Sequence, residues 1–300
     1  MKVFLVKLSK YALICLVITN IIALLSIGSI RNSDMFKPSF ILRYFSKENR
    51  NFDYVLMGPS TGLRGTDTSI IDSVLQKKGF NLSLDDSSYG AQYLMLEHFL
   101  HNGFTTKTLI LLLIPERMNT KDEIIYNNEF YFLPYIWERP VYNYFANKES
   151  GIMKIRAYTK YLPILGVSYY NQQLFFSSLI SSVKPHYMHH FDKNGNETYA
   201  IPNVPFEKKL KIDTLLFCNK DAKRIEALCK EKGIKLIYYY SPQYHEMIER
   251  PKALSDRIII DNGLTDEKRL FQDKYHLNVE GRRIATLALC DSLRTRNLLP

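Results

Sequence analysis

The sequence predicts an α/β fold of three layers, α/β/α, preceded by one N-terminal transmembrane helix. Past residue 33, short apolar runs alternate with amphipathic stretches, which is the pattern of a parallel sheet covered by helices. Before it, Tyr11 to Ile30 form a run of 20 residues without a charge, long enough for a helix to cross about 30 Å of hydrocarbon. We therefore divide the chain into an anchor at 1–33 and one domain at 34–300.

The apolar N-terminal run favours a membrane anchor over two alternatives. A cleaved signal peptide also begins with basic residues, but this run exceeds the usual apolar length of about 7 to 15 residues, and no A-x-A site follows. A buried core helix seldom lacks charge on every face. Basic residues flank the run on both sides: Lys2, Lys7 and Lys10 precede it, and Arg31, Lys37 and Arg43 follow it. These counts nearly balance, and we expect a single-pass protein with its domain on the extracytoplasmic side.

Strands and helices are predicted to alternate along the domain. The strands are expected at 53–57, 81–84, 108–114, 234–240 and 257–261. The helices are expected at 66–78, 91–102, 213–232 and 279–294. Between about 119 and 212 the pattern weakens and aromatic residues become frequent, so we interpret this region as an insertion.

Composition excludes several classes of protein. The 40 basic and 30 acidic residues give a net charge of +10, but bases and acids are interleaved, which argues against a nucleic-acid partner. The four cysteines form no CxxC pair, which argues against a zinc ribbon, a redox site and a disulfide scaffold. We expect no cofactor and no metal, and the positive charge favours an anionic membrane or envelope surface.

Three residues near the two ends of the domain form a candidate catalytic set. Ser60 follows the first strand, in MGPSTGLRG, at the end where open α/β sheets bind ligands. Asp273 and His276 lie three residues apart, just before the closing helix. A serine nucleophile needs a base to take its proton, and the base needs a carboxylate to fix its tautomer. Each residue alone also fits a turn, a helix cap or a surface position, but together they supply all three roles.

The segment G-P-S-T-G (58–62) also fits the G-x-S-x-G elbow of the α/β-hydrolases. Two features argue against that fold. The elbow normally follows several strands, whereas Ser60 follows the first one. The acid and the histidine normally come from separate loops, whereas a single D-x-x-H element holds both here.

The chain resembles the SGNH or GDSL-like hydrolases, and among them the membrane-anchored members associated with acyl transfer onto envelope polysaccharides. The resemblance rests on V-L-M-G-P-S-T-G-L-R-G (55–65), D-D-S-S-Y-G-A-Q (85–92) and D-K-Y-H-L-N-V-E-G (273–281). The third segment is the most specific. The first is looser, because Pro59 stands where the family more often has Asp or a small residue. The resemblance implies a flavodoxin-like α/β/α domain.

The resemblance also implies roles for individual residues. Ser60 corresponds to the nucleophile, His276 to the general base and Asp273 to its orienting acid. The backbone N–H groups of Ser60 and Gly90 correspond to the oxyanion hole, where removing one donor costs about 3–4 kcal/mol.

The third oxyanion donor is where the chain departs from the family. Hydrolytic members carry an asparagine in a G-x-N-D element after the third strand, and this chain has I-P-E-R-M-N (114–119) there. Arg117 or Asn119 is then the candidate third donor.

The function implied is that of a membrane-anchored serine enzyme acting on acyl groups of envelope polysaccharide, as an O-acyltransferase or an esterase. Its substrate would be a polysaccharide or a small acylated molecule. A transferase would also need a membrane-embedded acyl-donor protein as partner. The alternative is a non-catalytic SGNH-like subunit that binds or assembles glycan at the membrane, which the altered third element favours and the intact serine, aspartate and histidine oppose.

Two polar clusters and one aromatic group allow further interpretations. Asp85 and Asp86 suit a solvated loop better than a metal site. A second cluster, His186, His189, His190 and Asp192, contains zinc-binding side chains, but no predicted helix presents them on one face. The aromatic group either packs in a core or stacks on the substrate, and consists of Tyr126, Tyr131, Trp137, Tyr142, Tyr144 and Phe145.

Overall fold

A computed structural model describes residues 1–121, 129–148, 151–169, 176–187, 191–197, 205–207, 209–264 and 266–300. The chain forms two compact units. One comprises Met1–Tyr44 and Phe130–His189, and the other comprises Phe45–Glu129 and His190–Pro300. We call them the helical unit and the sheet unit.

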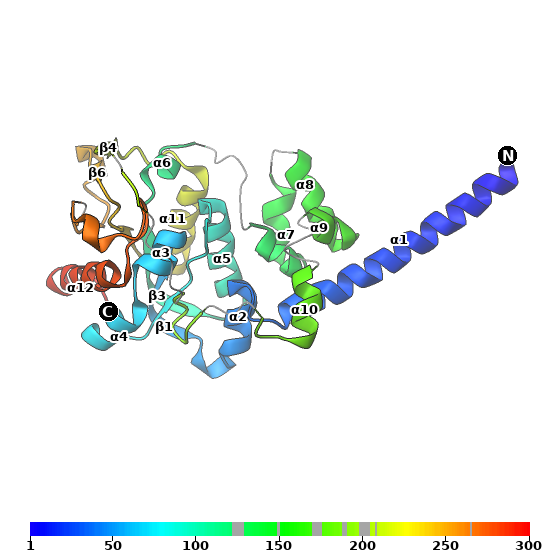
Figure 1. The fold of residues 1–300 in the computed structure, drawn as a ribbon, viewed down its shortest axis with the longest axis horizontal. Helices are drawn as coiled ribbons and strands as arrows, with labels where there is room; N and C mark the ends of the chain where they lie inside the picture. The colour runs from blue at the N-terminus through cyan, green and yellow to red at the C-terminus, as the bar shows by residue number, and fades with distance from the viewer. Residues whose placement is uncertain are drawn as a thin grey trace. The chain divides into compact units, whose positions relative to one another are not determined.

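The sheet unit is built on a parallel five-stranded sheet (Figure 1). Its strands are β1 (Asn51–Met57), β2 (Gly79–Asn81), β3 (Thr105–Leu112), β5 (Lys235–Tyr240) and β7 (Ile259–Asp261). They lie in the order β2-β1-β3-β5-β7, and every neighbouring pair is parallel. The predicted α/β class with a mostly parallel sheet is therefore confirmed.

Helices cover both faces of this sheet. They are α4 (Thr68–Leu75), α5 (Tyr89–His101), α11 (Lys220–Lys232) and α12 (Val279–Thr295). Two shorter helices, α3 (Ser60–Gly65) and α6 (Pro115–Met118), follow the carboxyl ends of β1 and β3. On one face, α4 and α12 pack together over a core that includes Leu56, Ile110 and Tyr239. The neighbouring Tyr238 points to the other face, because side chains alternate along a strand, and its hydroxyl donates to Glu226 of α11 at 2.6 Å.

Smaller elements complete the sheet unit. A two-stranded parallel sheet pairs β4 (Lys211–Thr214) with β6 (Glu246–Glu249). Short 3-10 turns are η1 (Lys47–Asn49), η5 (Lys252–Leu254) and η6 (Lys268–Leu270).

The helical unit consists of helices and turns. They are α1 (Lys2–Arg31), α2 (Lys37–Tyr44), the 3-10 segments η2 (Glu129–Tyr135) and η3 (Tyr158–Lys160), α7 (Arg139–Ala146), α8 (Gly151–Ala157), α9 (Ile164–Tyr169) and α10 (Ser177–Val183). Across the described residues, α1 is the one helix long and apolar enough to cross a membrane. That is the segment for which the sequence predicts an anchor.

Several predicted boundaries are wrong. The helix expected at 66–78 is α4, which is shorter than predicted and begins after Asp67, because the Asp67 side chain caps it by accepting from the Ser69 N–H. The helix α3, which ends at Gly65, is not among the predicted helices. The helix expected at 213–232 begins only at Lys220, where Asn219 provides the cap, and its first residues belong to β4. The short strand expected at 81–84 is β2, which ends at Asn81.

Candidate active site

Ser60 is the first residue of α3, directly beyond the carboxyl end of β1. The Pro59 carbonyl accepts from the backbone N–H groups of Gly62 and Leu63, which starts the helix at the serine. Gly58 packs so closely against the neighbouring strand β3 that a Cβ at position 58 would lie 2.6 Å from Cβ of Leu112. The close approach of this turn to β3 fixes Ser60 at the ligand-binding edge of the sheet.

Asp273 and His276 lie in a tight turn before α12. The Asp273 Oδ1 atom accepts from the backbone N–H groups of Tyr275 and His276, both at 2.8 Å. Asn278 then caps α12 by accepting from the Gly281 N–H at 2.9 Å. The D-x-x-H-L-N sequence thus forms one rigid turn that aims the imidazole.

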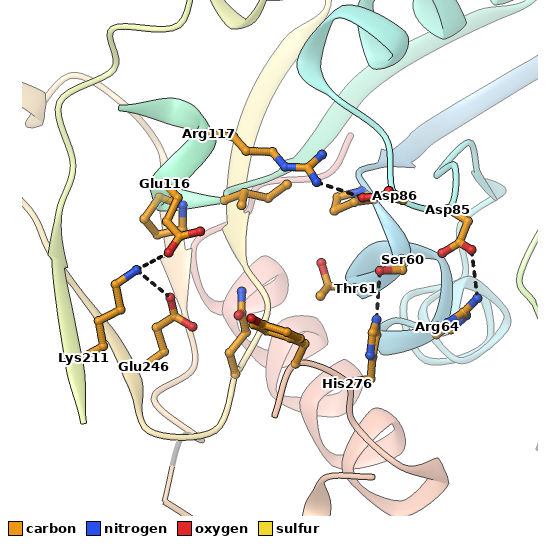
Figure 2. Close-up of a pocket in the computed structure, with 15 residues that line it drawn as sticks. Ser60, Thr61, Arg64, Asp85, Asp86, Glu116, Arg117, Lys211, Glu246 and His276 are labelled. Atoms are coloured by element: carbon orange, nitrogen blue, oxygen red, sulfur yellow. Dashed lines mark hydrogen bonds and ion pairs between the residues drawn. The ribbon is translucent and has the colours of Figure 1, made fainter. Parts of the chain in front are cut away.

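The three predicted residues form a continuous series of hydrogen bonds, of which Figure 2 shows the bond between His276 and Ser60. His276 Nδ1 lies 2.9 Å from Asp273 Oδ2, and His276 Nε2 lies 2.9 Å from Ser60 Oγ. Burial alone would raise the pKa of Asp273, but hydrogen bonds from the Tyr275 N–H and from His276 outweigh it and lower that pKa. Asp273 is therefore an ionised acceptor, so Nδ1 carries the imidazole proton and Nε2 is left to accept from the serine hydroxyl.

Ser60 and His276 line a pocket of about 530 Å³. It lies within the sheet unit, and charged side chains make up about half of its lining. The lining consists of Pro59, Ser60, Thr61, Arg64, Asp85, Asp86, Ile114, Pro115, Glu116, Arg117, Lys211, Gln243, Glu246, Tyr275 and His276.

The predicted oxyanion residues occupy different places. Gly90 is buried in the first turn of α5, two residues past the capping Ser88, and the preceding loop lines the pocket instead with Asp85 and Asp86. Arg117 does line the pocket: its guanidinium donates to the Ser87 carbonyl and to Asp86 Oδ1, the latter at 3.0 Å. The structure thus brings Arg117 to the pocket wall and leaves Gly90 behind it.

Asn119 has a structural place outside the pocket lining. Its amide donates to the Thr214 carbonyl and accepts from the Leu216 N–H, both at 2.7 Å. It therefore fastens the end of α6 to β4, one wall of the site.

The acidic residues of the pocket are paired with cations. The Asp85 carboxylate forms an ion pair with the Arg64 guanidinium, with Oδ2 3.2 Å from Nη2. Across the pocket the Lys211 ammonium forms an ion pair with the Glu116 carboxylate, and its Nζ lies 3.7 Å from Glu246 Oε1 (Figure 2). Burial alone would lower the pKa of Lys211, but its bonds to Glu116 and Asp213 outweigh it and raise that pKa. Lys211 is therefore a permanent cation among carboxylates.

The remaining predicted clusters do not form a metal site in the described residues, where no group of three His, Cys, Asp or Glu could hold an ion. His186 bonds Asp34 of the helical unit. Asp192 instead accepts from the backbone of Asn194 at 2.8 Å and of Asn196 at 2.9 Å. His189 and His190 lie outside the described residues.

The described members of the aromatic group, from Tyr131 to Phe145, belong to the helical unit. Tyr131 lies against Phe36 with ring centroids 4.3 Å apart, and Tyr144 meets Phe145 edge to face. None of the described members lines the pocket. Tyr126 lies outside the described residues. The described contacts agree with packing rather than with stacking on a substrate.

A turn at residues 191–197, which we call the buttress turn, contacts α3, α4 and β2 and has no catalytic sequence signal. Asn196 is fully buried, and its side chain accepts from both the backbone and the hydroxyl of Thr68 and from the Asn81 amide. Glu197 is the last residue of the turn. Its Oε2 lies 3.5 Å from Nε of Arg64 in α3 and forms an ion pair with it. Sequence analysis identifies D-K-N-G-N-E only as a turn, because these partners lie more than 100 residues away.

The chain matches no protein-family model, and no curated protein sequence matches it. The interpretation of the site therefore rests on its geometry.

Proposed function

We propose that this protein is a membrane-anchored serine enzyme that transfers acyl groups through an acyl-serine at Ser60. The observation that carries the proposal is the chain of hydrogen bonds from Ser60 through His276 to Asp273, at the edge of a pocket of about 530 Å³. A nucleophile, a base within 2.9 Å and a carboxylate orienting that base are the three parts of a serine triad.

The fold supports an SGNH-like assignment. Counted along the chain, the five strands of the main sheet have the order 2-1-3-4-5, which is the order of flavodoxin-like proteins. In that order the carboxyl ends of β1 and β3 form the switch point where ligands bind, and Ser60 follows β1. The anchoring role belongs to α1, the helix with the length and apolarity of a membrane span.

In the proposed reaction, Ser60 Oγ attacks the carbonyl carbon of an ester while its proton moves to His276 Nε2. Asp273 stabilises the resulting imidazolium. When the tetrahedral adduct collapses, the ester C–O bond breaks and His276 returns the proton to the leaving alkoxide. An incoming hydroxyl then gives its proton to His276 and attacks the acyl carbon. The bond between that carbon and Ser60 Oγ breaks, and His276 returns the proton to Ser60 Oγ.

The negative oxygen of the adduct needs donors placed before the reaction begins. The N–H of Ser60, at the start of α3, is the first candidate. Arg117 is the second, since its guanidinium lies at the pocket wall.

The pocket lining favours a hydroxyl-rich acceptor. Carboxylates accept hydrogen bonds from sugar hydroxyls, and arginine and lysine donate to them, and both kinds of side chain surround Ser60. An envelope polysaccharide is therefore the proposed acceptor, and water would make the same site an esterase.

The test uses the full chain in detergent with a serine-reactive phosphonate and a chromogenic acetyl ester. Labelling and ester cleavage are expected for the wild type and for Ser73→Ala, an exposed serine of α4, and should vanish in Ser60→Ala. A folded wild-type protein that neither labels nor cleaves would refute acyl-serine chemistry and favour a glycan-binding subunit. Adding a polysaccharide acceptor then separates the two enzymes, because acyl transfer to sugar is measured directly on the glycan.

A further inference from the structure

The short helix α10 buries two of its four serines and exposes all three of its apolar residues. Ser178 and Ser181 are 1% and 2% exposed, whereas Leu179 and Val183 are 50% and 80% exposed. A helix that faces water shows the opposite arrangement, with polar residues outward. The outer face of α10 is therefore built for an apolar medium.

The buried side of α10 packs against the C-terminal third of α1 (Figure 1). In α1 the buried residues all lie in that third, and they include Ala23 and Ser26. Small residues are buried on both helices: Ser178 and Ser181 on α10, and Ala23 and Ser26 on α1, where Ala23 packs against Val167 of α9. Small residues at a helix pair are typical of membranes, where close backbone approach replaces the hydrophobic effect as the source of stability.

The helix α9 is joined to the apolar run of α1 by a hydrogen bond. Asn20 Oδ1 accepts from the backbone N–H of Ile164 at 3.2 Å. Ile164 is the first residue of α9, and the N–H groups of a first helical turn have no partner inside the helix. In hydrocarbon such a group must be satisfied by protein, and Asn20 does this from within the uncharged run.

The depth of this contact can be worked out along α1. Asn20 is the tenth residue of the 20-residue uncharged run. The 11 residues from Asn20 to Arg31 correspond to about 16 Å of helix, roughly half of a hydrocarbon core. Val167 of α9 packs against Ala23 and Ile27 along the same stretch.

The charges of this region suit a lipid surface. From residue 151 to 191 the sequence contains no Asp or Glu but four basic residues. Lys154 and Lys184 are exposed and Lys160 is partly exposed, whereas Arg156 is buried. Next to them Tyr158 and Tyr161 are 58% and 65% exposed. Lysine beside anionic headgroups, and tyrosine at the boundary between water and acyl chains, are the usual companions of an inserted apolar face.

We propose that α9 and α10 insert into the lipid bilayer beside α1, with Leu179, Ile180 and Val183 in contact with acyl chains. The occupant of this face is the bilayer itself. The inference rests on α1 as the membrane span of the proposed function, and it extends the membrane-embedded part of the chain to a second segment more than 130 residues away.

The test places a single tryptophan at chosen positions of the full chain in vesicles of phosphatidylcholine and phosphatidylglycerol. Trp137 is the chain's one tryptophan, so Trp137→Phe gives the background. Leu179→Trp is then compared with Ile14→Trp on α1 and with Val279→Trp, an 85% exposed position on α12. Phospholipids brominated in the acyl chain are expected to quench positions 14 and 179 alike, and aqueous iodide to quench position 279.

The possible outcomes distinguish insertion of α9 and α10 from membrane anchoring by α1 alone. Quenching by brominated lipid at position 14 but not at 179 would overturn the inference and leave α1 as the span. Quenching at neither position would overturn both. Val183→Trp supplies a second reporter on the same face if Leu179→Trp does not fold.

A protein partner on this face is distinguished in native membranes. A benzophenone amino acid in place of Ile180 is expected to give lipid adducts on illumination. A discrete protein adduct would overturn the assignment of lipid as the occupant.

Discussion

Replacing Asp273 by asparagine changes one atom of the site and tests how the imidazole is oriented. The carboxylate accepts from two backbone N–H groups through Oδ1 and from His276 Nδ1 through Oδ2. In Asp273→Asn the amide oxygen can keep the two backbone bonds, which turns the amide nitrogen toward Nδ1. Because that nitrogen donates, the imidazole proton moves to Nε2, and Nε2 can no longer accept the proton of Ser60.

The expected loss is large in rate and small in stability. The same change in serine triads lowers kcat by about 10⁴, which corresponds to about 5.4 kcal/mol of barrier. Two of the three bonds survive, so the free energy of unfolding should fall by about 1 kcal/mol. Since the pKa of Asp273 is lowered in the folded protein, its ionised form stabilises the fold above the ordinary pKa. The part of the stability difference between the wild type and Asp273→Asn that comes from this ionisation therefore disappears as pH falls through the lowered pKa of Asp273.

The assay measures kcat on a chromogenic acetyl ester and the rate of phosphonate labelling, with urea unfolding as the check on folding. The matched control is Asp221→Asn, which also removes one carboxylate of an ion pair, with Arg224 at 2.7 Å, but on α11. It should leave kcat unchanged. If Asp273→Asn kept more than about a tenth of the wild-type kcat, the tautomer argument would be wrong.

Three further changes follow from the same structure. Gly195→Ala would place a Cβ 2.5 Å from the Asn81 carbonyl at a φ of +78°, so we expect a loss of about 2–3 kcal/mol in urea unfolding. Gly103→Ala, at the same φ but in open space, should lose only about 1 kcal/mol, and equal losses would contradict the clash. Burial raises the pKa of Asp72 to about 6. The folded state therefore binds the proton more tightly, and stability should fall as pH rises from about 4 to 6. In Asp72→Asn this slope should flatten, and an unchanged slope in the urea midpoints would assign it to another group. Arg117→Ala should lower kcat on the acetyl ester by about 10² if the guanidinium stabilises the oxyanion; a change confined to KM would assign it to substrate binding instead.

The candidate catalytic residues are predictable from sequence because most of their signals are local. A buried run ending at Met57 predicts a strand, and ligands of parallel sheets gather at carboxyl ends, so Ser60 stands out. The D-x-x-H spacing allows the carboxylate and the imidazole to meet within one turn, as they do at 2.9 Å. Only the approach of Ser60 to His276 spans the whole domain, and it is inferred from the resemblance rather than from spacing.

The parts that sequence reasoning misses depend on distant partners. The glycine segment is placed correctly after β2, but Ser88 caps α5 there and draws Gly90 into the helix, which leaves Asp86 at the pocket. β4 has only four residues of mixed exposure, and it pairs with a strand more than 30 residues away. Nothing local marks Lys211 as a residue of the site.

The buttress turn has a consequence for the order in which the protein folds. β2 is an edge strand, and the Asn81 N–H donates to the Asn194 carbonyl at 2.8 Å. At about 5–20 residues per second, synthesis needs roughly 6–23 seconds to pass from one residue to the other. During that interval the emerging chain carries an open strand edge, which is a template for pairing with other chains. Nascent chains that stop before residue 191 should therefore leave the β2 edge open to other chains or to chaperones, whereas chains that extend past residue 197 can cover this edge.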